Sequence, residues 1–363
     1  MTVEIQGSRR GIILSAIIAA MFIAAGFWAS RRTSTVTSAS FGIALPDAPP
    51  AAPLSWRPLG EPGSGGAMTA FAFDPRKPER LFVAGDMLGI GVSNDNGKTY
   101  GGGFGLPSFE IADFTFHPTN AETVWAGTMS GPALSTDGGQ TWKVLRSGFP
   151  ETNGGMYSAP VEKILFVEGA TNPAHLLAFG GSSRRWNSPG EPAWGAVWES
   201  TSGGESWTRL VTLGASGAVA NGKGRNIVSA SQSSDGDILY AGLDGAGVWR
   251  SGDSGKTWAK ATGFPHDNVE RVVADPKNPR TVYAVFDNAP PARSGEPRLP
   301  GGIYKSVDGG TTWRGIVKGL NLHANPDPNF TARFKAFCVS PANTNVLFVS
   351  DSSWNKSAIY RSA

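Results

Sequence analysis

Three aspartates share one place in a recurring pattern, four residues after an aromatic residue in an apolar segment. They are Asp86, Asp244 and Asp287, which follow Phe82, Tyr240 and Tyr283. Asp351 lies near the corresponding place in a further segment. Two carboxylates about 5 to 9.5 Å apart across a cleft can cleave a glycosidic bond, one as the acid and the other as nucleophile or base. Aspartates at strand ends also bind loop backbone, so the pattern leaves a catalytic and a structural role open.

A second group of candidates could bind a ligand. Tryptophan rings stack on sugar rings, and arginines bind acidic groups. The candidates are Trp186, Trp194, Trp354, Arg184 and Arg185. Tryptophans that pack loops and arginines that are solvated on loops are the competing interpretation.

Other chemistries find little support. The four histidines are scattered, Cys338 is the single cysteine, and no nucleotide-binding fingerprint is present, so we expect neither a metal site nor a cofactor. Taking Arg9, Arg10, Arg31 and Arg32 from the 32 basic residues and Glu4 from the 29 acidic ones leaves 28 of each. The rest of the chain therefore has no net charge, which argues against a nucleic-acid partner, since a surface that binds nucleic acid needs concentrated positive charge.

One motif, S-x-D-x-G-x-x-W, the Asp-box, indicates the strands and turns that must position these residues. Its five copies begin at Ser93, Ser135, Ser200, Ser251 and Ser306, at spacings of 42, 65, 51 and 55 residues. The motif predicts a β-hairpin turn in which the aspartate accepts backbone N–H groups and the glycine takes a positive φ. We therefore predict structural roles for Asp95, Asp137, Asp253 and Asp308. Ser202 replaces the aspartate in the third copy, which a structural turn tolerates.

An apolar strand, a turn that usually contains proline and a second strand precede each box. Adding one strand that ends at the box and one that starts at its aromatic residue gives a four-stranded blade, so the sequence predicts an all-β fold, a β-propeller. Six blade starts can be counted, the third near Val161 and the fourth near Ile227. Trp56 lies in an isolated strand-like segment that would complete the sixth blade. If the chain is a fragment, we expect seven or more blades.

Propeller geometry sorts the loops between two faces. The Asp-boxes join strands three and four on one face, whereas the strand two-to-three loops and the connections between blades emerge on the other. The long loops 180–195 and 287–301 belong to this second face. Function collects on loops held by a rigid scaffold, so we expect any site there.

The N-terminus predicts export or anchoring. Residues 11–30 are apolar and follow Arg9-Arg10, and twenty residues can just span a bilayer core. The segment 1–32 is therefore a single transmembrane anchor, a cleaved secretory signal or a twin-arginine signal. A flexible linker over 33–53 and the propeller over 54–363 follow, on the periplasmic, cell-envelope or secreted side.

The repeats resemble the BNR/Asp-box propellers, which include sialidases, family 74 xyloglucanases, the sortilin luminal domain and photosystem II assembly-factor-like proteins. The opening, with Trp56, Gly65-Gly66 and the strand that ends at Gly85-Asp86, is similar to the start of glycoside hydrolase family 74. That resemblance implies that Asp86 corresponds to a catalytic aspartate of the family.

The chain also departs from this family. Gly85 stands where the family usually has threonine, Ile90 interrupts a glycine pair, and the second propeller that supplies the partner acid is not in the sequence. Two hypotheses follow. One is an extracytoplasmic, carbohydrate-active glycoside hydrolase-like propeller. The other is a non-catalytic propeller that binds a protein or a glycan on its loop-rich face.

Overall fold

The structure is a computed structural model that describes residues 3–4, 68–85, 89–106, 110–149, 160–167, 171–180, 195–214, 226–291 and 293–362. The expected leader 1–32, apart from the backbone of Val3–Glu4, and the linker 33–53 lie outside these residues. Within the described ranges, no helix is long and apolar enough to cross a membrane.

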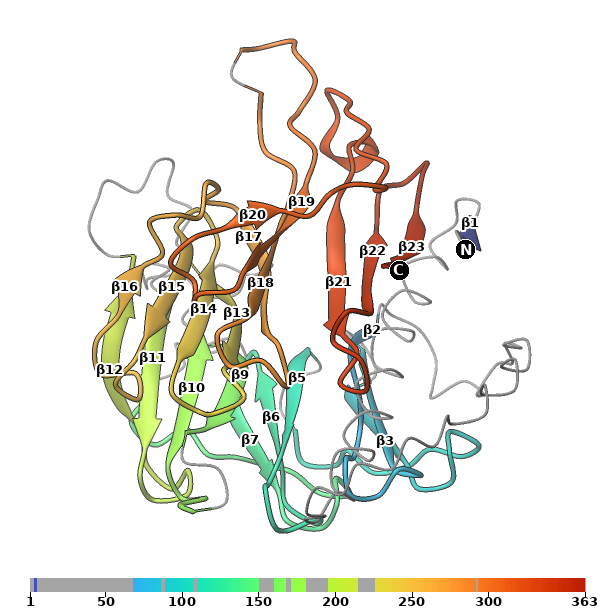
Figure 1. The fold of residues 1–363 in the computed structure, drawn as a ribbon. Coiled ribbons are helices and arrows are strands. Elements are labelled where there is room, and N and C mark those ends of the chain that lie inside the picture. Colours follow the sequence, from blue (N-terminus) through green and yellow to red (C-terminus); the bar gives the residue numbers. More distant parts are fainter. Residues whose placement is uncertain are drawn as a thin grey trace, which may run out of the picture.

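The fold is an all-β propeller of six antiparallel sheets, coloured from blue to red along the chain in Figure 1. The first blade holds β2 (Met68–Phe73), β3 (Leu81–Gly85) and β4 (Gly89–Ser93). The second holds β5 (Ile111–Phe116), β6 (Val124–Thr128), β7 (Gly131–Ser135) and β8 (Lys143–Val144), and the third β9 (Val161–Phe166), β10 (Leu176–Gly180), β11 (Gly195–Ser200) and β12 (Thr208–Leu213). The fourth holds β13 (Ile227–Gln232), β14 (Leu239–Leu243), β15 (Gly247–Ser251) and β16 (Ala259–Lys260), and the fifth β17 (Val269–Ala274), β18 (Val282–Phe286), β19 (Gly302–Ser306) and β20 (Arg314–Gly315). The sixth holds β21 (Phe334–Val339), β22 (Leu347–Asp351), β23 (Ala358–Arg361) and β1 (Val3–Glu4).

The predicted fold class and the count of six blades are confirmed. In the described part, helix is limited to one 3₁₀ turn, Pro328–Phe330. The first blade has three named strands, and a bridge from Val92 to Gly101 marks the place of the fourth. At the outer edge of the sixth blade, β1 pairs with Ala358 and Ile359 of β23. The segment around Trp56, expected at this edge, lies outside the described residues.

The hydrophobic core is divided into layers between neighbouring blades. The second strands of the first five blades are buried throughout, and their apolar residues pack against those of the next blade. Trp125 of β6, 2% exposed, packs on Trp198 and Trp207 of the third blade in this way. A blade therefore needs its neighbours to bury its surface, as expected of a repeat fold.

The Asp-box turns have the predicted geometry. In the fourth copy the Ser251 hydroxyl donates to Asp253 Oδ1 at 2.8 Å and accepts the Gly255 N–H at 2.9 Å. Asp253 also accepts the N–H of Thr257 at 2.8 Å and its hydroxyl at 2.5 Å. The copies of Asp95, Asp137 and Asp308 repeat this pattern. In the third copy the Ser202 hydroxyl accepts the Ser206 N–H at 3.0 Å, so the turn survives without a carboxylate.

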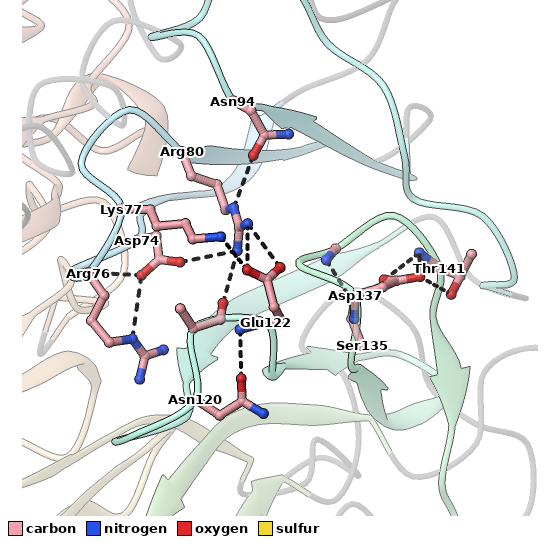
Figure 2. A network of polar contacts seen from close by, with 12 residues as sticks. Asp74, Arg76, Lys77, Arg80, Asn94, Asn120, Glu122, Ser135, Asp137 and Thr141 are labelled. Atoms are coloured by element: carbon pink, nitrogen blue, oxygen red, sulfur yellow. Dashed lines mark hydrogen bonds and ion pairs between the residues drawn. The ribbon is translucent and has the colours of Figure 1, made fainter.

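A partly buried ion network joins the first two blades near the second Asp-box (Figure 2). Arg80, 6% exposed, donates to both carboxylate oxygens of Glu122, at 3.0 and 3.2 Å, and lies 3.5 Å from the fully buried Asp74. Its remaining contacts are the Ala121 carbonyl at 2.9 Å and Asn94 Oδ1 at 3.0 Å. One guanidinium therefore pairs with acids of two blades, and without it Asp74 would keep only the ion pair with Arg76 at 3.9 Å.

We expect Asp253→Ala to destabilise the propeller at neutral pH and to lose that effect in acid. The hydrogen bonds from Thr257 and Ser251 lower the pKa of Asp253 to about 2, so the ionised carboxylate stabilises the fold above its unfolded pKa. This contribution disappears in the wild type as the pH falls from about 4 to about 2. Thermal melts of the two proteins should differ at pH 7 and converge toward pH 2. Asp237→Ala, at an exposed turn position, is the control, and a difference between wild type and Asp253→Ala that persists at pH 2 would contradict the prediction.

Arg80→Met should destabilise the protein by about 2–3 kcal/mol, because the buried Asp74 keeps only its longer ion pair with Arg76, at 3.9 Å, and Glu122 loses two hydrogen bonds. The measurement is the free energy of unfolding in urea at pH 7. Arg314→Met, at an exposed position of β20, should change it by less than about 0.5 kcal/mol. Equal effects of the two substitutions would show that the network between the blades contributes nothing.

Candidate functional site

The inner strands of the six blades all begin at one end of the central channel, and the opening there is the candidate site. A cavity of about 380 Å³ lies at this mouth. Each of the six inner strands contributes its second or third residue to the lining, namely Thr69, Ala112, Glu162, Val228, Arg271 and Lys335. The loop between β18 and β19 rises above the ring on the same face, at the top of Figure 1. The mouth therefore lies on the loop-rich face that propeller geometry predicted.

Charge around the mouth is divided between the two sides of the ring. Glu110 and Glu162 line it from the second and third blades, whereas Arg333 and Lys335 line it from the sixth. Glu270 of the fifth blade lies against the cations, with its Oε2 2.7 Å from Lys335 Nζ. The cavity thus offers carboxylates and cationic donors to one ligand, a combination that suits a polyhydroxylated molecule.

Asp287, one of the three predicted carboxylates, joins this cationic side. Its Oδ2 lies 3.1 Å from Lys335 Nζ and 3.4 Å from Arg333 Nη2, and its Oδ1 accepts the Asn288 N–H at 2.8 Å. Burial alone would raise the pKa of Asp287, but Lys335 and Arg333 outweigh it and hold the pKa below its ordinary value. Asp287 is therefore ionised at neutral pH and is suited to accepting hydrogen bonds rather than to donating a proton.

Of the other two predicted carboxylates, the structure describes Asp244 but not Asp86. Asp244 follows β14 on the same face, where its N–H donates to the Asn226 carbonyl at 2.9 Å and it forms a bridge with Asn268. Asp86 lies outside the described residues, as do Trp186, Trp194, Arg184 and Arg185. The structure thus places Asp244 and Asp287 at matching positions of adjacent blades, as the repeat predicts.

Trp354 lies in the turn after β22 with 59% of its surface exposed. Its ring centroid lies 5.8 Å from that of Phe330 in a T-shaped arrangement, and its backbone N–H donates to the Asn329 carbonyl at 2.8 Å. Two loops thus hold one exposed aromatic surface in place. Such a surface can stack on the C–H face of a sugar ring.

Asp351 holds the turn that carries Trp354. It is fully buried, and its Oδ1 accepts the backbone N–H groups of Ser353 at 2.9 Å and Arg333 at 3.2 Å. Burial raises the pKa of this carboxyl above its ordinary value. His323 lies between the two loops, with Nε2 3.1 Å from Ser353 Oγ and Nδ1 3.9 Å from Asp351 Oδ2. Because Asp351 is sealed from solvent, it positions the turn rather than meeting a ligand.

Sequence reasoning missed the charged residues at the starts of the inner strands. The signal was present: Val161-Glu162-Lys163 and Val269-Glu270-Arg271 place an acid and a base inside otherwise apolar strands, as does Lys335 after Phe334. An inner strand faces a channel on one side, so a charge there indicates a residue that lines it. Within the described part of the chain, no three His, Cys, Asp or Glu side chains converge as metal ligands.

Comparison with known proteins identifies relatives of one kind. The chain is 30% identical over 252 residues to the xyloglucanase Xgh74A of Acetivibrio thermocellus, a match over 63% of this chain and 28% of that enzyme. It is 30% identical over 166 residues to a Paenibacillus xyloglucanase, covering 40% of this chain and 16% of the relative. The chain thus spans under a third of the length of these curated relatives. No family model matches it.

Solved structures support the fold. An ancestral enzyme of glycoside hydrolase family 74 superposes with a TM-score of 0.60 at 23% identity, over 82% of this chain and 36% of that one. The family 74 enzyme of Niastella koreensis gives 0.55 at 21% identity, over 79% and 44%. The chain is therefore similar to family 74 propellers in sequence and in fold, as the opening segment predicted.

The cluster of Asp287, Glu270 and Lys335 generates a prediction. Lys335→Met should lower stability at pH 7 by about 2–3 kcal/mol, because two largely buried carboxylates lose their shared cation. The lowered pKa of Asp287 means that its pairing stabilises the wild type above pH about 4 and is lost as the carboxyl is protonated in acid. Urea unfolding at pH 7 and pH 3 should therefore show a gap that narrows at pH 3. Lys356→Met, at an exposed position on the same face, is the control, and a gap that is constant with pH would contradict the pairing.

Proposed function

We propose that this protein is an exported, carbohydrate-active propeller that binds a xyloglucan-like β-glucan across its loop-rich face. The observation that carries the proposal is the similarity to xyloglucanases over 252 residues. The structure adds groups of suitable chemistry, since the channel mouth presents carboxylates and cations, and the turn after β22 presents the exposed ring of Trp354. A neutral, branched glucan needs many hydrogen bonds and apolar stacking surfaces rather than a strong charge.

For hydrolysis, Asp86 is the candidate catalytic carboxylate, with Asp244 and Asp287 as weaker candidates for its partner. In the sequence Asp86 directly follows β3, the position that Asp244 and Asp287 take after β14 and β18. In this scheme one carboxyl protonates the glycosidic oxygen while the other attacks the sugar or activates water. Asp287, ionised and paired with Lys335, fits the second of these roles better than the first.

The second candidate function is binding of a glycan or a protein without catalysis, and one observation favours it. A general acid needs a raised pKa. Among the described carboxyls whose pKa is clearly shifted, Asp351 has the raised value, and it is fully buried. In the hydrolysis scheme Asp86 is our candidate for that donor, and a face without a proton donor would recognise its ligand and leave it intact.

The test uses the full chain, its Asp86→Asn variant and xyloglucan, with an unbranched β-1,4-glucan and an α-glucan for comparison. Hydrolysis predicts reducing ends from xyloglucan that fall on the order of 10²- to 10⁴-fold in Asp86→Asn, with binding retained. Asp244→Asn and Asp287→Asn identify the partner by the same loss. Binding without products in wild type would establish the recognition function instead, and neither binding nor products would reject a xyloglucan ligand.

Stacking on Trp354 has its own test. Trp354→Ala should weaken binding of xyloglucan oligosaccharides about tenfold, measured by calorimetry, because the exposed ring contributes its face to the sugar. Leu299→Ala, an exposed apolar residue on the same face, is the matched control. Equal affinity of Trp354→Ala and wild type would remove this residue from the proposed site.

Export remains part of the proposal, with residues 1–32 as a cleaved signal or an anchor. Expression of the full chain followed by fractionation and N-terminal sequencing distinguishes the two. A mature N-terminus after residue 32 indicates cleavage, an intact chain in the membrane fraction indicates an anchor, and an intact chain in the cytoplasm contradicts export.

A further inference from the structure

The inner strands of the six blades share one irregularity at the channel mouth. In the first five blades the pairing with the second strand shifts between the first and third residues of the inner strand, and in β21 it shifts across Lys335 and Ala336. A bulge of this kind leaves a residue out of the ladder and redirects its side chain. Residues at all six bulges line the cavity of about 380 Å³, namely Thr69, Ala112, Glu162, Val228, Glu270 and Lys335. A ring of bulges therefore forms the mouth of the channel.

The channel continues beyond this ring. A second cavity, of about 500 Å³, follows the inner strands as far as Pro276 and Pro341, in the turns at the other ends of β17 and β21. The two cavities share five lining residues at the level of the ring, namely Thr69, Ala112, Glu162, Val228 and Arg271. Both volumes lie in the range of about 300–1,000 Å³ that small-molecule sites occupy. The channel can therefore hold a ligand of the size of a monosaccharide.

Arg271 differs from the other cations of the inner strands. Lys163 is paired with Asp113, and Lys335 Nζ lies 2.7 Å from Glu270 Oε2. Among the described residues, by contrast, the Arg271 guanidinium has no ion-pair partner and donates no hydrogen bond. The structure describes the six inner strands throughout, and Arg271 is the one exposed residue in them. Its charge therefore faces the interior of the channel without a counter-ion from the described part of the protein.

The acids of the channel do not take the place of that counter-ion. Glu270 precedes Arg271 in β17, but its carboxylate contacts Lys335. Glu110 and Glu162 border the same cavity from the second and third blades, and neither forms an ion pair with Arg271. Because like charges repel, these carboxylates leave the Arg271 side as the place for an anionic group. They can accept hydrogen bonds from the hydroxyls of the same ligand.

The guanidinium determines which anionic group fits. Its planar fork donates two parallel hydrogen bonds to a carboxylate, a geometry that a hydroxyl cannot match. The wall of the channel beside Arg271 includes the apolar Val228, Val272 and Val273. A charge-assisted hydrogen bond is stronger beside such a wall than in open solvent, because the local dielectric constant is lower.

We propose that Arg271 forms a carboxylate-binding site inside the central channel, at the level where the two cavities meet. Its ligand carries one carboxylate for Arg271 and hydroxyls for the acids across the channel, as hexuronic acids do. The site is separate from the exposed ring of Trp354. It does not depend on the proposed binding of a neutral glucan, whose failure would leave this site untouched.

The test is calorimetric titration of the full chain with D-glucuronate, D-glucose and acetate. D-glucuronate should bind with a Kd on the order of 1 mM or tighter, and D-glucose, which lacks the carboxylate, at least about tenfold more weakly. Arg271→Met should weaken D-glucuronate binding at least about tenfold, and Arg271→Lys should recover only part of it, because lysine keeps the charge without the fork. Arg314→Met, which removes an exposed arginine of β20 outside the channel, is the matched control and should bind as wild type does.

A fold control accompanies these variants. Arg271→Met should melt within about 2 °C of wild type, because the side chain is exposed and has no partner among the described residues. Trp354→Ala should bind D-glucuronate as wild type does, which separates this site from the proposed glucan site.

Arginine modification locates the ligand. Phenylglyoxal should react with Arg271 in the free protein, and saturating D-glucuronate should slow that reaction about tenfold, since few sites are then unoccupied. Arg314 should react at the same rate with and without the ligand. Peptide mass spectrometry measures both rates.

Two results support the carboxylate site and distinguish its ligands. Selective binding of D-glucuronate assigns it to a sugar acid, and equally tight binding of acetate assigns it to small organic acids in general. Equal affinity for D-glucose and D-glucuronate, unchanged binding in Arg271→Met, no protection of Arg271, or no binding of either acid would each overturn the proposal.

Discussion

The contact between an Asp-box and the blade before it is the interaction on which the propeller depends. The serine and aspartate of the box close a tight hairpin, and its glycine has no side chain, so the turn lies directly on the second strand of the neighbouring blade. A buried strand such as β6 or β14 has its apolar surface covered only when that neighbour is present. The core is therefore a series of thin layers, each shared by two blades, and the stability of any blade is inseparable from that of the next.

The two faces of the propeller differ in what they carry, and this difference explains where the candidate site lies. One face carries the Asp-boxes, the proline-containing turns and the Arg80 network, which join neighbouring blades. The opposite face carries the strand two-to-three loops and the connections between blades, which vary in length and composition without disturbing the layers. Charged residues at the starts of β9, β17 and β21 meet at the channel mouth because six inner strands begin at the same height around one axis.

Two kinds of carboxylate occur in this propeller, and their surroundings separate them. The box aspartates are exposed or partly exposed and are held ionised by hydroxyl and backbone hydrogen bonds, which suits a turn. Asp287 is largely buried and is held ionised by Lys335 and Arg333, which places a fixed negative charge at the functional face. Asp351, buried beside neutral donors and His323, has a raised pKa and holds the turn of Trp354. Similar positions in the repeat thus acquire different chemistry from their neighbours.

The sequence by itself determined the all-β class, the six blades, the box turns and the face on which Asp244 and Asp287 lie. These features depend on local rules, namely the alternation of apolar residues, the turn chemistry of Ser, Asp and Gly, and the regular return of one motif. Only the tertiary structure decided that Lys335 joins Glu270 to Asp287, that Arg80 serves acids of two blades, and that Glu162 and Arg271 border one channel. Each of these contacts joins residues that are far apart in the chain or lie in different blades, so their pairing follows from the arrangement of the blades around the axis and not from any pattern within one segment.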